Sequence, residues 1–144
     1  MKRLFVAILV CALAITAMAV NVSAAYISNP SVIVVQDVNG SRKHSVLTIS
    51  SNNAKCTSTY VESNTQVRSI KVVQVLEKKN SNGTFTSVSG GTWTTTVYSS
   101  TASVTSEKKS ITSGTYRLKT VFTATLSNGT TETTTVYSSN KTIN

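Results

Sequence analysis

The side chains best suited to hydrolytic chemistry lie close together near the start of the chain. Asp37, Ser41 and His44 are the residue types of a Ser-His-Asp triad, in which His activates the Ser hydroxyl and Asp orients the His. All three flank the dipeptide Asn39-Gly40, and Asp and Ser are common residues beside turns. A working triad also needs an oxyanion site, usually supplied by distant segments. We therefore expect a turn here and no enzyme activity, with a hydrolase as a remote alternative.

Carboxylates and metal-binding residue types are few and scattered. Segment 25–144 contains one His, one Asp and four Glu, and the glutamates fall near the ends of extended segments, where we expect them to be solvated: Glu62, Glu77, Glu107 and Glu132. One His and one Cys cannot supply the four ligands of a zinc site. A calcium loop starting at Asp37 would need Glu at its twelfth position, which is Thr48 here. We expect neither a metal nor a cofactor.

Positive charge is the chemical feature that remains. The chain has 14 Lys and Arg against 5 Asp and Glu, a formal net charge of +9. Six of these cations lie beside predicted hairpins or point outward from a predicted strand, and they form the candidate binding surface: Lys78, Lys79, Lys108, Lys109, Arg117 and Lys119. Such a surface keeps a small domain dispersed or attracts polyanions such as teichoic acids, anionic lipid headgroups and acidic glycans. Nucleic acid is not expected, because aromatic residues are not interleaved with the basic ones.

The segments that must position these cations are predicted to be β-strands. Beyond residue 25, Thr, Val and Ser dominate, and apolar residues alternate with polar ones instead of recurring at helical spacing. Asn-Gly occurs at 39–40, 82–83 and 128–129 and favours two-residue type I′ hairpin turns. We predict the hairpins 31–38 with 42–51, 67–79 with 84–89 and 115–126 with 131–139, and further extended segments at 54–62, 92–99 and 101–106. Seven to nine strands at this spacing indicate an all-β fold, an antiparallel β-sandwich.

Two segments nearly repeat each other. Residues 92–100 (TWTTTVYSS) and 131–139 (TETTTVYSS) are identical at eight of nine positions. Both are rich in Thr, which suits a pleated surface with one side in water. We expect both to be solvent-facing edge strands, with an internal duplication as the alternative.

The strand around Tyr116 has the clearest alternation. Its inward face is predicted to hold Tyr116, Leu118, Thr120, Phe122, Ala124 and Leu126. The preceding Ser-Gly-Thr at 113–115 leads into Tyr116 in a way that resembles the start of strand F in immunoglobulin-like domains. That resemblance implies that the Tyr hydroxyl bonds to backbone upstream and that Leu118 faces strand B, on which Cys56 is a buried core residue. The Trp of strand C is missing, so a fibronectin-type or other sandwich also fits.

Residues 1–24 are predicted to be a signal peptide. Lys2 and Arg3 precede an apolar run at 4–20, and small residues follow. We expect cleavage after Ala24, with cleavage after Ala19 or retention as a membrane anchor as alternatives. The domain would then be 25–144, with twelve basic and five acidic side chains and a formal net charge of +7. It keeps a single cysteine, Cys56, so no internal disulfide is expected although the protein would be secreted and extracellular.

Three short motifs resemble those of small secreted single-domain β-sandwich proteins of uncharacterised function from Gram-positive bacteria. They are Ala54-Lys55-Cys56, the stretch 76–79 (LEKK) followed by Asn-Gly at 82–83, and 114–119 (GTYRLK). This resemblance implies a compartment and a fold but no activity. We expect a non-enzymatic cell-envelope or surface interaction module favouring anionic polymers, on a cell wall or a membrane surface. An exported antimicrobial or toxin-like protein is the alternative.

Overall fold

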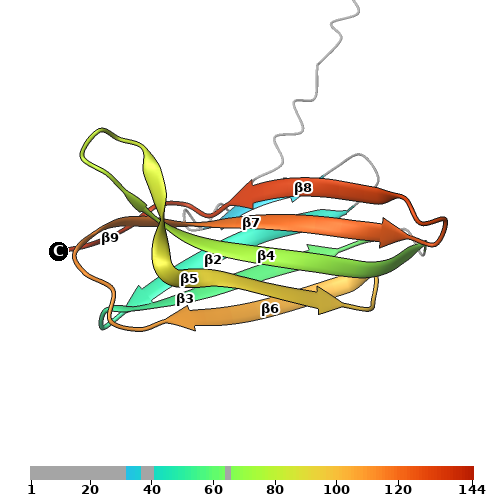
Figure 1. The fold of residues 1–144 in the computed structure, drawn as a ribbon, viewed down its shortest axis with the longest axis horizontal. Helices are drawn as coiled ribbons and strands as arrows, with labels where there is room; N and C mark the ends of the chain where they lie inside the picture. The colour runs from blue at the N-terminus through green and yellow to red at the C-terminus, as the bar shows by residue number, and fades with distance from the viewer. Residues whose placement is uncertain (1–31, 37–40, 64–65) are drawn as a thin grey trace, which may run out of the picture.

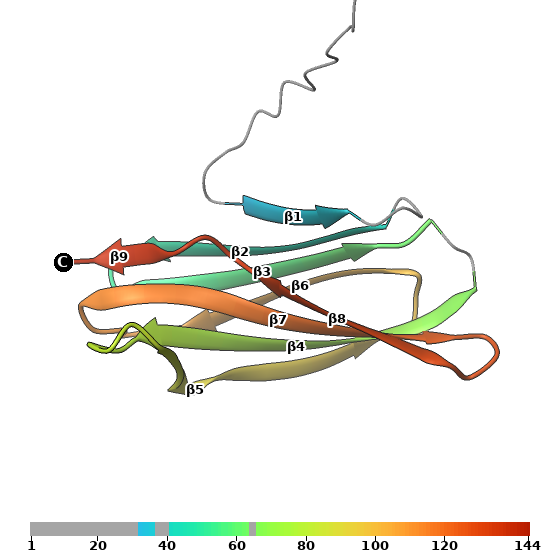
Figure 2. The same cartoon turned by 90° about the horizontal axis from the view of Figure 1, so that it is seen from above.

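Two antiparallel sheets form the molecule. The computed structural model describes residues 32–36, 41–63 and 66–144, so the predicted signal peptide, Asp37 and the Asn39-Gly40 turn lie outside the described residues. Sheet one has the order β1-β2-β3-β6, with β1 (Val32–Gln36), β2 (Arg42–Ser50), β3 (Asn53–Val61) and β6 (Thr101–Lys108). Sheet two has the order β5-β4-β7-β8, with β4 (Val67–Lys79), β5 (Phe85–Val97), β7 (Gly114–Leu126) and β8 (Thr131–Tyr137), while β9 (Lys141–Ile143) also pairs with β7. Figures 1 and 2 show the two layers face-on and edge-on.

The prediction of an immunoglobulin-like antiparallel β-sandwich is confirmed. The chain changes sheets three times, between β3 and β4, between β5 and β6 and between β6 and β7, and β4, β5, β7 and β8 make one sheet. At the crossing from β6 to β7 the Tyr116 hydroxyl donates to the backbone oxygen of Thr112 at 2.7 Å. This is the upstream bond that pins the corner before strand F in such domains. Among the described residues no helix is long and apolar enough to cross a membrane.

The predicted pairing of the hairpins is correct, but the predicted turn type is wrong at both described Asn-Gly sites. Gly83 and Gly129 have φ of 86° and 85°, whereas Asn82 and Asn128 are not at positive φ. The Gly129 N–H donates to the oxygen of Leu126 at 3.0 Å, and the Gly83 N–H makes the matching bond to Asn80. Each loop is therefore longer than two residues and ends in a left-handed glycine. Each Asn side chain instead accepts a hydrogen bond from the Thr two residues on.

A two-residue loop of the expected kind joins β2 to β3, where no Asn-Gly occurs. Ser51 and Asn52 have φ of 47° and 63°, and Ser50 pairs directly with Asn53. Positive φ at both central residues matches a type I′ turn, and Asn is one of the side chains that tolerate it. The resulting β2–β3 hairpin was not predicted from the sequence.

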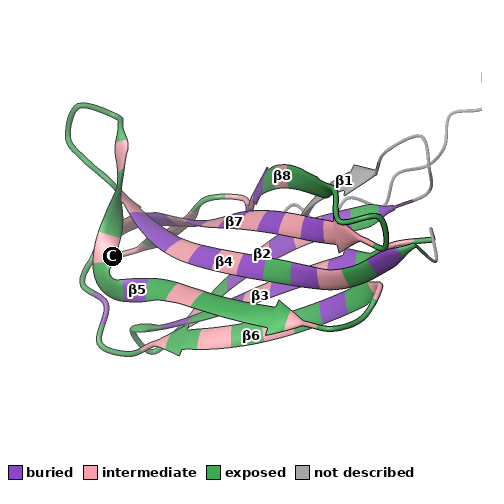
Figure 3. Ribbon diagram, turned by 45° about the vertical axis from the view of Figure 1, so that its right-hand side comes forward, coloured by how far each residue is buried: buried purple, intermediate pink, exposed green. Residues whose placement is uncertain are grey.

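Strand β7 runs through the centre of sheet two and confirms the predicted alternation. Residues 116, 118, 120, 122 and 124 are buried and the residues between them are half-buried, whereas Leu126 at the strand end, also predicted to face inward, is only half-buried. Figure 3 shows the same stripes on β4 and β7, whereas β5 is mostly exposed and β6 alternates between exposed and partly buried residues. Of the two near-identical segments, 92–100 begins within β5 and 131–139 begins with β8. These are the two outer strands of sheet two, so the prediction that both segments belong to edge strands is confirmed.

The core consists of two apolar clusters separated by a polar layer. One cluster contains Tyr60, Ile70, Val72 and Phe122, and the other contains Leu47, Cys56, Leu76, Tyr116 and Leu118. Along β3, β4 and β7, the residues between the clusters are Ser58, Gln74 and Thr120, all fully buried.

The polar layer satisfies most of its own hydrogen bonds. The Gln74 Nε2 donates to the oxygen of Cys56 at 3.0 Å and to Ser58 Oγ at 2.8 Å. The Thr120 hydroxyl bonds to the hydroxyls of Ser58, at 2.7 Å, and Ser45. The Gln74 Oε1 has no partner among the described residues. Because buried polar groups cost free energy when unpaired, this layer fixes how the two sheets face each other.

Candidate functional site

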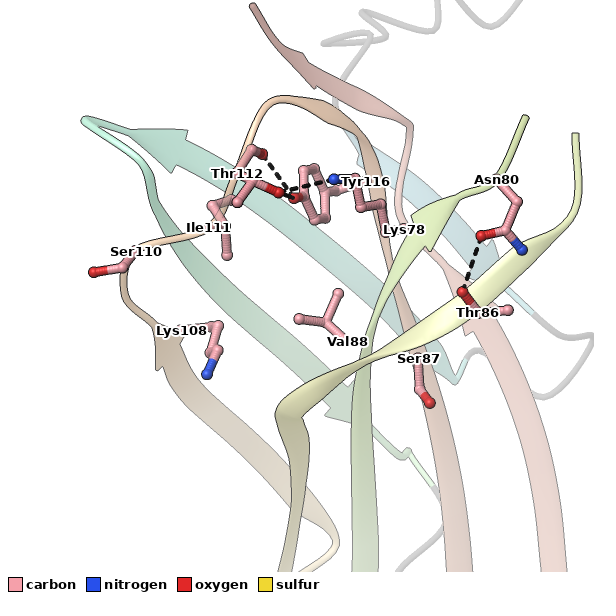
Figure 4. A pocket seen from close by; sticks show the side chains of 10 residues that line it. All are labelled: Lys78, Asn80, Thr86, Ser87, Val88, Lys108, Ser110, Ile111, Thr112 and Tyr116. Carbon is pink, nitrogen blue, oxygen red and sulfur yellow. Dashed lines mark hydrogen bonds between the residues drawn. The ribbon is translucent and has the colours of Figure 1, made fainter.

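A pocket of about 250 Å³ lies at the end of the sandwich where β4, β6 and the start of β7 meet. Two lysines, Lys78 and Lys108, reach it from different sheets. The other lining residues are apolar, hydroxylated or amide side chains: Asn80, Thr86, Ser87, Val88, Ser110, Ile111, Thr112 and Tyr116. Figure 4 shows Val88 and Ile111 between Lys108 on one side and Lys78 on the other. The ten described lining residues thus carry two positive charges and no carboxylate.

The ammonium group of Lys78 is held by the corner that precedes β7. Its Nζ donates to Thr112 Oγ1 at 2.8 Å and lies 5.5 Å from the centre of the Tyr116 ring. A Cβ at position 114 would stand 2.5 Å from Lys78 Cε, so any residue other than glycine would force the Lys78 side chain to move. Gly114 also has φ of 141°, which other residues rarely adopt. An ammonium has three N–H donors, so Nζ retains donors for a ligand.

A second glycine, Gly90, lies close to the ammonium group of Lys108. Gly90 has φ of 66°, and a Cβ there would lie 3.1 Å from Lys108 Nζ. The pairing of β4 with β5 is interrupted between Val75 and Glu77, and β5 residues 88–91 have no paired partner there. This bulge lets the hairpin tip bend away from the rest of sheet two (Figure 1). The bend brings Val88 to the pocket.

The six cations predicted from the sequence fall into three groups. Lys78 and Lys108 line the pocket. Lys79 and Lys109 are exposed and follow them directly in the chain. Arg117 and Lys119 are half-buried and alternate with inward-facing Tyr116 and Leu118, so they lie on the outer face of sheet two.

Arg117 is engaged in contacts within the protein. Its Nε donates to Glu77 Oε2 at 2.6 Å, and its guanidinium lies 4.0 Å from the ring centre of Phe85 and 4.3 Å from that of Tyr137. The prediction that Glu77 is a solvated strand-end carboxylate is therefore wrong, because its side chain is only 11% exposed in this ion pair. A cation stacked between two rings and paired with a carboxylate holds strands together.

Of the residues of the remote hydrolase alternative, Asp37 lies outside the described residues, and Ser41 and His44 are not brought together. Ser41 is buried and its hydroxyl donates to Glu62 Oε2 at 2.6 Å. His44 is three residues further on and lies half-buried on the other face of the chain, paired with Thr59. Burial lowers the pKa of His44 from its usual value. Within the described ranges no group of three His, Cys, Asp or Glu residues could hold a metal ion.

Cys56 is a buried core residue, as the resemblance to immunoglobulin-like domains implied. It is fully buried in the same cluster as Leu118 and forms no disulfide. Burial raises the pKa of the Cys56 thiol to about 12. The reactive species is the thiolate, which is then scarce at neutral and mildly alkaline pH.

We therefore expect Cys56 to be unreactive in the folded protein. At about pH 8, dithiodipyridine should modify it orders of magnitude more slowly than in urea-unfolded protein, where a thiol has a pKa of about 8.5. Absorbance of the released thiopyridone measures both rates. Equal rates in folded and unfolded protein would show that the thiol is accessible.

Sequence reasoning found the two pocket lysines but not the pocket. Val88 and Ile111 are isolated apolar residues in polar stretches, and nothing in their spacing points to a shared site. The signal that could have indicated it is Gly114, two residues before Tyr116, since a glycine beside a strand often marks close approach of another group.

Comparisons with known proteins identify no family. No protein-family model and no curated protein sequence matches the chain. Among solved structures, wild-type OgpA from Akkermansia muciniphila is similar with a TM-score of 0.36 and 10% identity, over 83% of this chain and 31% of that chain. The catalytically inactive OgpA in complex with an O-glycopeptide, glycodrosocin, is similar with a TM-score of 0.35 and 10% identity, over 82% of this chain and 32% of the other. The chain thus spans about a third of these proteins, and we draw no functional argument from the likeness.

Proposed function

We propose that this protein is a secreted, non-enzymatic binding module for anionic glycopolymers of the cell envelope. The observation that carries the proposal is that Lys78 and Lys108, from opposite sheets, both line one pocket. Two ammonium groups on an open pocket attract a phosphate or carboxylate group, and no neighbouring acid in the lining cancels their charge.

The remaining lining residues suit a sugar or polyol. Val88 is half-buried and offers apolar contact, and the exposed hydroxyls of Thr86, Ser87 and Thr112 can donate or accept hydrogen bonds. Sites for small ligands combine such apolar walls with a few placed polar groups. Lys79 and Lys109 are exposed beside the pocket and add to the attraction without belonging to it. The ligand class that fits these features is a hydroxyl-rich polymer bearing regular negative charges.

The test is binding of purified domain 25–144 to glucosylated poly(glycerol phosphate), measured by titration calorimetry at several salt concentrations. We expect Lys78→Met with Lys108→Met to weaken binding by about tenfold or more, since hydrogen bonds to charged groups contribute roughly 1.5–3 kcal/mol each. Binding of the unaltered domain should fall as salt rises, because exposed charges are screened.

The matched control removes two cations elsewhere. Arg68 and Lys71 are exposed and lie near the opposite end of β4 from Lys78. Arg68→Met with Lys71→Met lowers the net charge equally and should leave most of the affinity. Equal loss in both double variants would mean that net charge alone attracts the polymer. Polygalacturonate and anionic lipid vesicles, used as further probes, distinguish carboxylate polymers and membranes from the phosphate polymer.

A further inference from the structure

A second pocket, of about 300 Å³, lies on the outer side of sheet one close to the first. It is lined by residues of β2, β3, β6 and the β2–β3 turn: Thr48, Ser50, Ser51, Asn53, Lys55 and Glu107. Lys55 and Glu107 are directly paired across β3 and β6, so their opposite charges are neighbours. This pocket has hydroxyl, amide and carboxylate groups but no net charge, in contrast to the first pocket.

The two pockets share a wall at the end of β6. Glu107 lines the second pocket and the next residue, Lys108, lines the first, because successive side chains of a strand point to opposite sides. Ser110, which also lines the first pocket, donates its N–H to Asn53 Oδ1 of the second at 3.3 Å. The Ile111 N–H donates to the backbone oxygen of Asn52 at 2.8 Å.

These bonds fix the corner segment 108–112 against the β2–β3 turn. Residues of this segment line the first pocket, Glu107 just before it lines the second, and β6 is an edge strand of sheet one. A chain-like ligand that leaves the first pocket can therefore pass over Ser110 into the second without meeting another strand. A single small anion can fill only the first.

We propose that the second pocket is an accessory subsite for the same polymer, which crosses the end of β6 at Ser110. The inference rests on the proposed function and adds to it the length and composition of the ligand. Anionic groups bind at Lys78 and Lys108, and a neutral, hydroxyl-rich unit of the same chain binds between Asn53, Lys55 and Glu107. The carboxylate of Glu107 accepts hydrogen bonds from hydroxyls, and it repels an anion that would otherwise compete for Lys55.

The experiment compares two lengths of one probe. The affinity of domain 25–144 is measured for long glucosylated poly(glycerol phosphate) and for its dimeric fragment. The variant Lys55→Ala with Glu107→Ala removes one charge of each sign, so the net charge stays the same. We expect it to weaken binding of the long polymer by about threefold to tenfold and to leave binding of the dimer unchanged.

Two further variants complete the design. Arg68→Ala with Glu132→Ala is the charge-neutral control at exposed positions outside both pockets, and it should bind both probes normally. Thr48→Val removes one hydroxyl from the second pocket and keeps a residue that favours strands, so the protein should stay fully folded. We expect its affinity for the long polymer to fall by less than that of Lys55→Ala with Glu107→Ala.

The outcomes separate this inference from the proposed function. If Lys55→Ala with Glu107→Ala binds the long polymer as the unaltered domain does, while Lys78→Met with Lys108→Met does not bind it, the accessory subsite is wrong and the proposed function stands. If the lysine variant of the first pocket binds both probes normally, the proposed function is wrong, and with it the basis of the subsite.

Discussion

Replacing Phe122 with Ala is expected to lower the free energy of unfolding by about 3–5 kcal/mol, the range for truncating a buried aromatic side chain. Phe122 is fully buried in the middle of β7 and packs in the cluster that contains Ile70 and Val72. Its ring centre lies 5.5 Å from that of Tyr60 on β3, with the rings tilted by 59°. This contact joins the two sheets directly, so the variant loses apolar burial and an aromatic pair at once. Urea denaturation followed by tryptophan fluorescence measures the loss.

The neighbouring residue provides the control for Phe122. Thr123 is half-buried and lies on the opposite face of β7. Thr123→Ala loses some strand propensity and a contact to Thr133, which is worth about 1 kcal/mol at most. A Phe122→Ala protein no less stable than Thr123→Ala would contradict the assignment of the core between the sheets.

Much of the fold could be predicted because its pattern is local. Alternation along β7 and the turn signals at Asn82-Gly83 and Asn128-Gly129 define strands and partners within short stretches of sequence. The resemblance of the Tyr116 stretch to strand F of immunoglobulin-like domains adds a tertiary prediction, the bond from its hydroxyl to backbone upstream, which the structure confirms. The strands, the hairpin partners and the Tyr116 bond could all be predicted because each depends on a short stretch of backbone and on the side chains that this stretch turns toward the core.

The turn type was predicted wrongly because hydrogen bonds between the Asn side chain and the Thr two residues on compete with the type I′ conformation. Asn128 tolerates positive φ, but here its side chain accepts hydrogen bonds from both the N–H and the hydroxyl of Thr130. The same pattern joins Asn82 to Thr84. The Thr that follows each Asn-Gly pair therefore favours a longer loop with only the glycine at positive φ.

The polar layer could not be predicted, because each member looks ordinary alone. Gln74 interrupts the apolar face of β4, and Ser58 interrupts that of β3. Either residue would indicate a solvated position or a strand end if taken singly. Only the packed sheets bring them together with Thr120, where their hydrogen bonds satisfy one another.

The pocket escaped prediction for a similar reason. Its cations are 30 residues apart in the chain, and their approach depends on a β-bulge near Val75 and on two glycines. The doublets 78–79 and 108–109 indicated a basic surface, but they could not show which lysine of each pair faces the pocket. The contacts that hold Arg117 within the protein were likewise not predictable, because the rings of Phe85 and Tyr137 come from other strands.

Replacing Gly114 with Ala is expected to impair both stability and polymer binding. A residue with a side chain at φ of 141° is strained, and such conformations cost about 1–3 kcal/mol. The new Cβ would stand 2.5 Å from Lys78 Cε, so the Lys78 side chain must leave its place over Tyr116 and give up its bond to Thr112. Because these contacts position Lys78, one of the two pocket cations, we expect their loss to weaken binding of glucosylated poly(glycerol phosphate) by about threefold to tenfold.

Gly129 separates the two effects of that change. It has φ of 85°, and a Cβ there would meet no atom within 4 Å, in a loop at the far end of β7 from the pocket. Gly129→Ala should therefore lose stability through backbone strain yet bind the polymer as the unaltered domain does. Below the unfolding transition of both variants, a binding defect confined to Gly114→Ala would come from displacement of Lys78. Equal binding by the two would mean that the position of Lys78 over Tyr116 does not matter for the ligand, leaving Lys108 to carry the attraction.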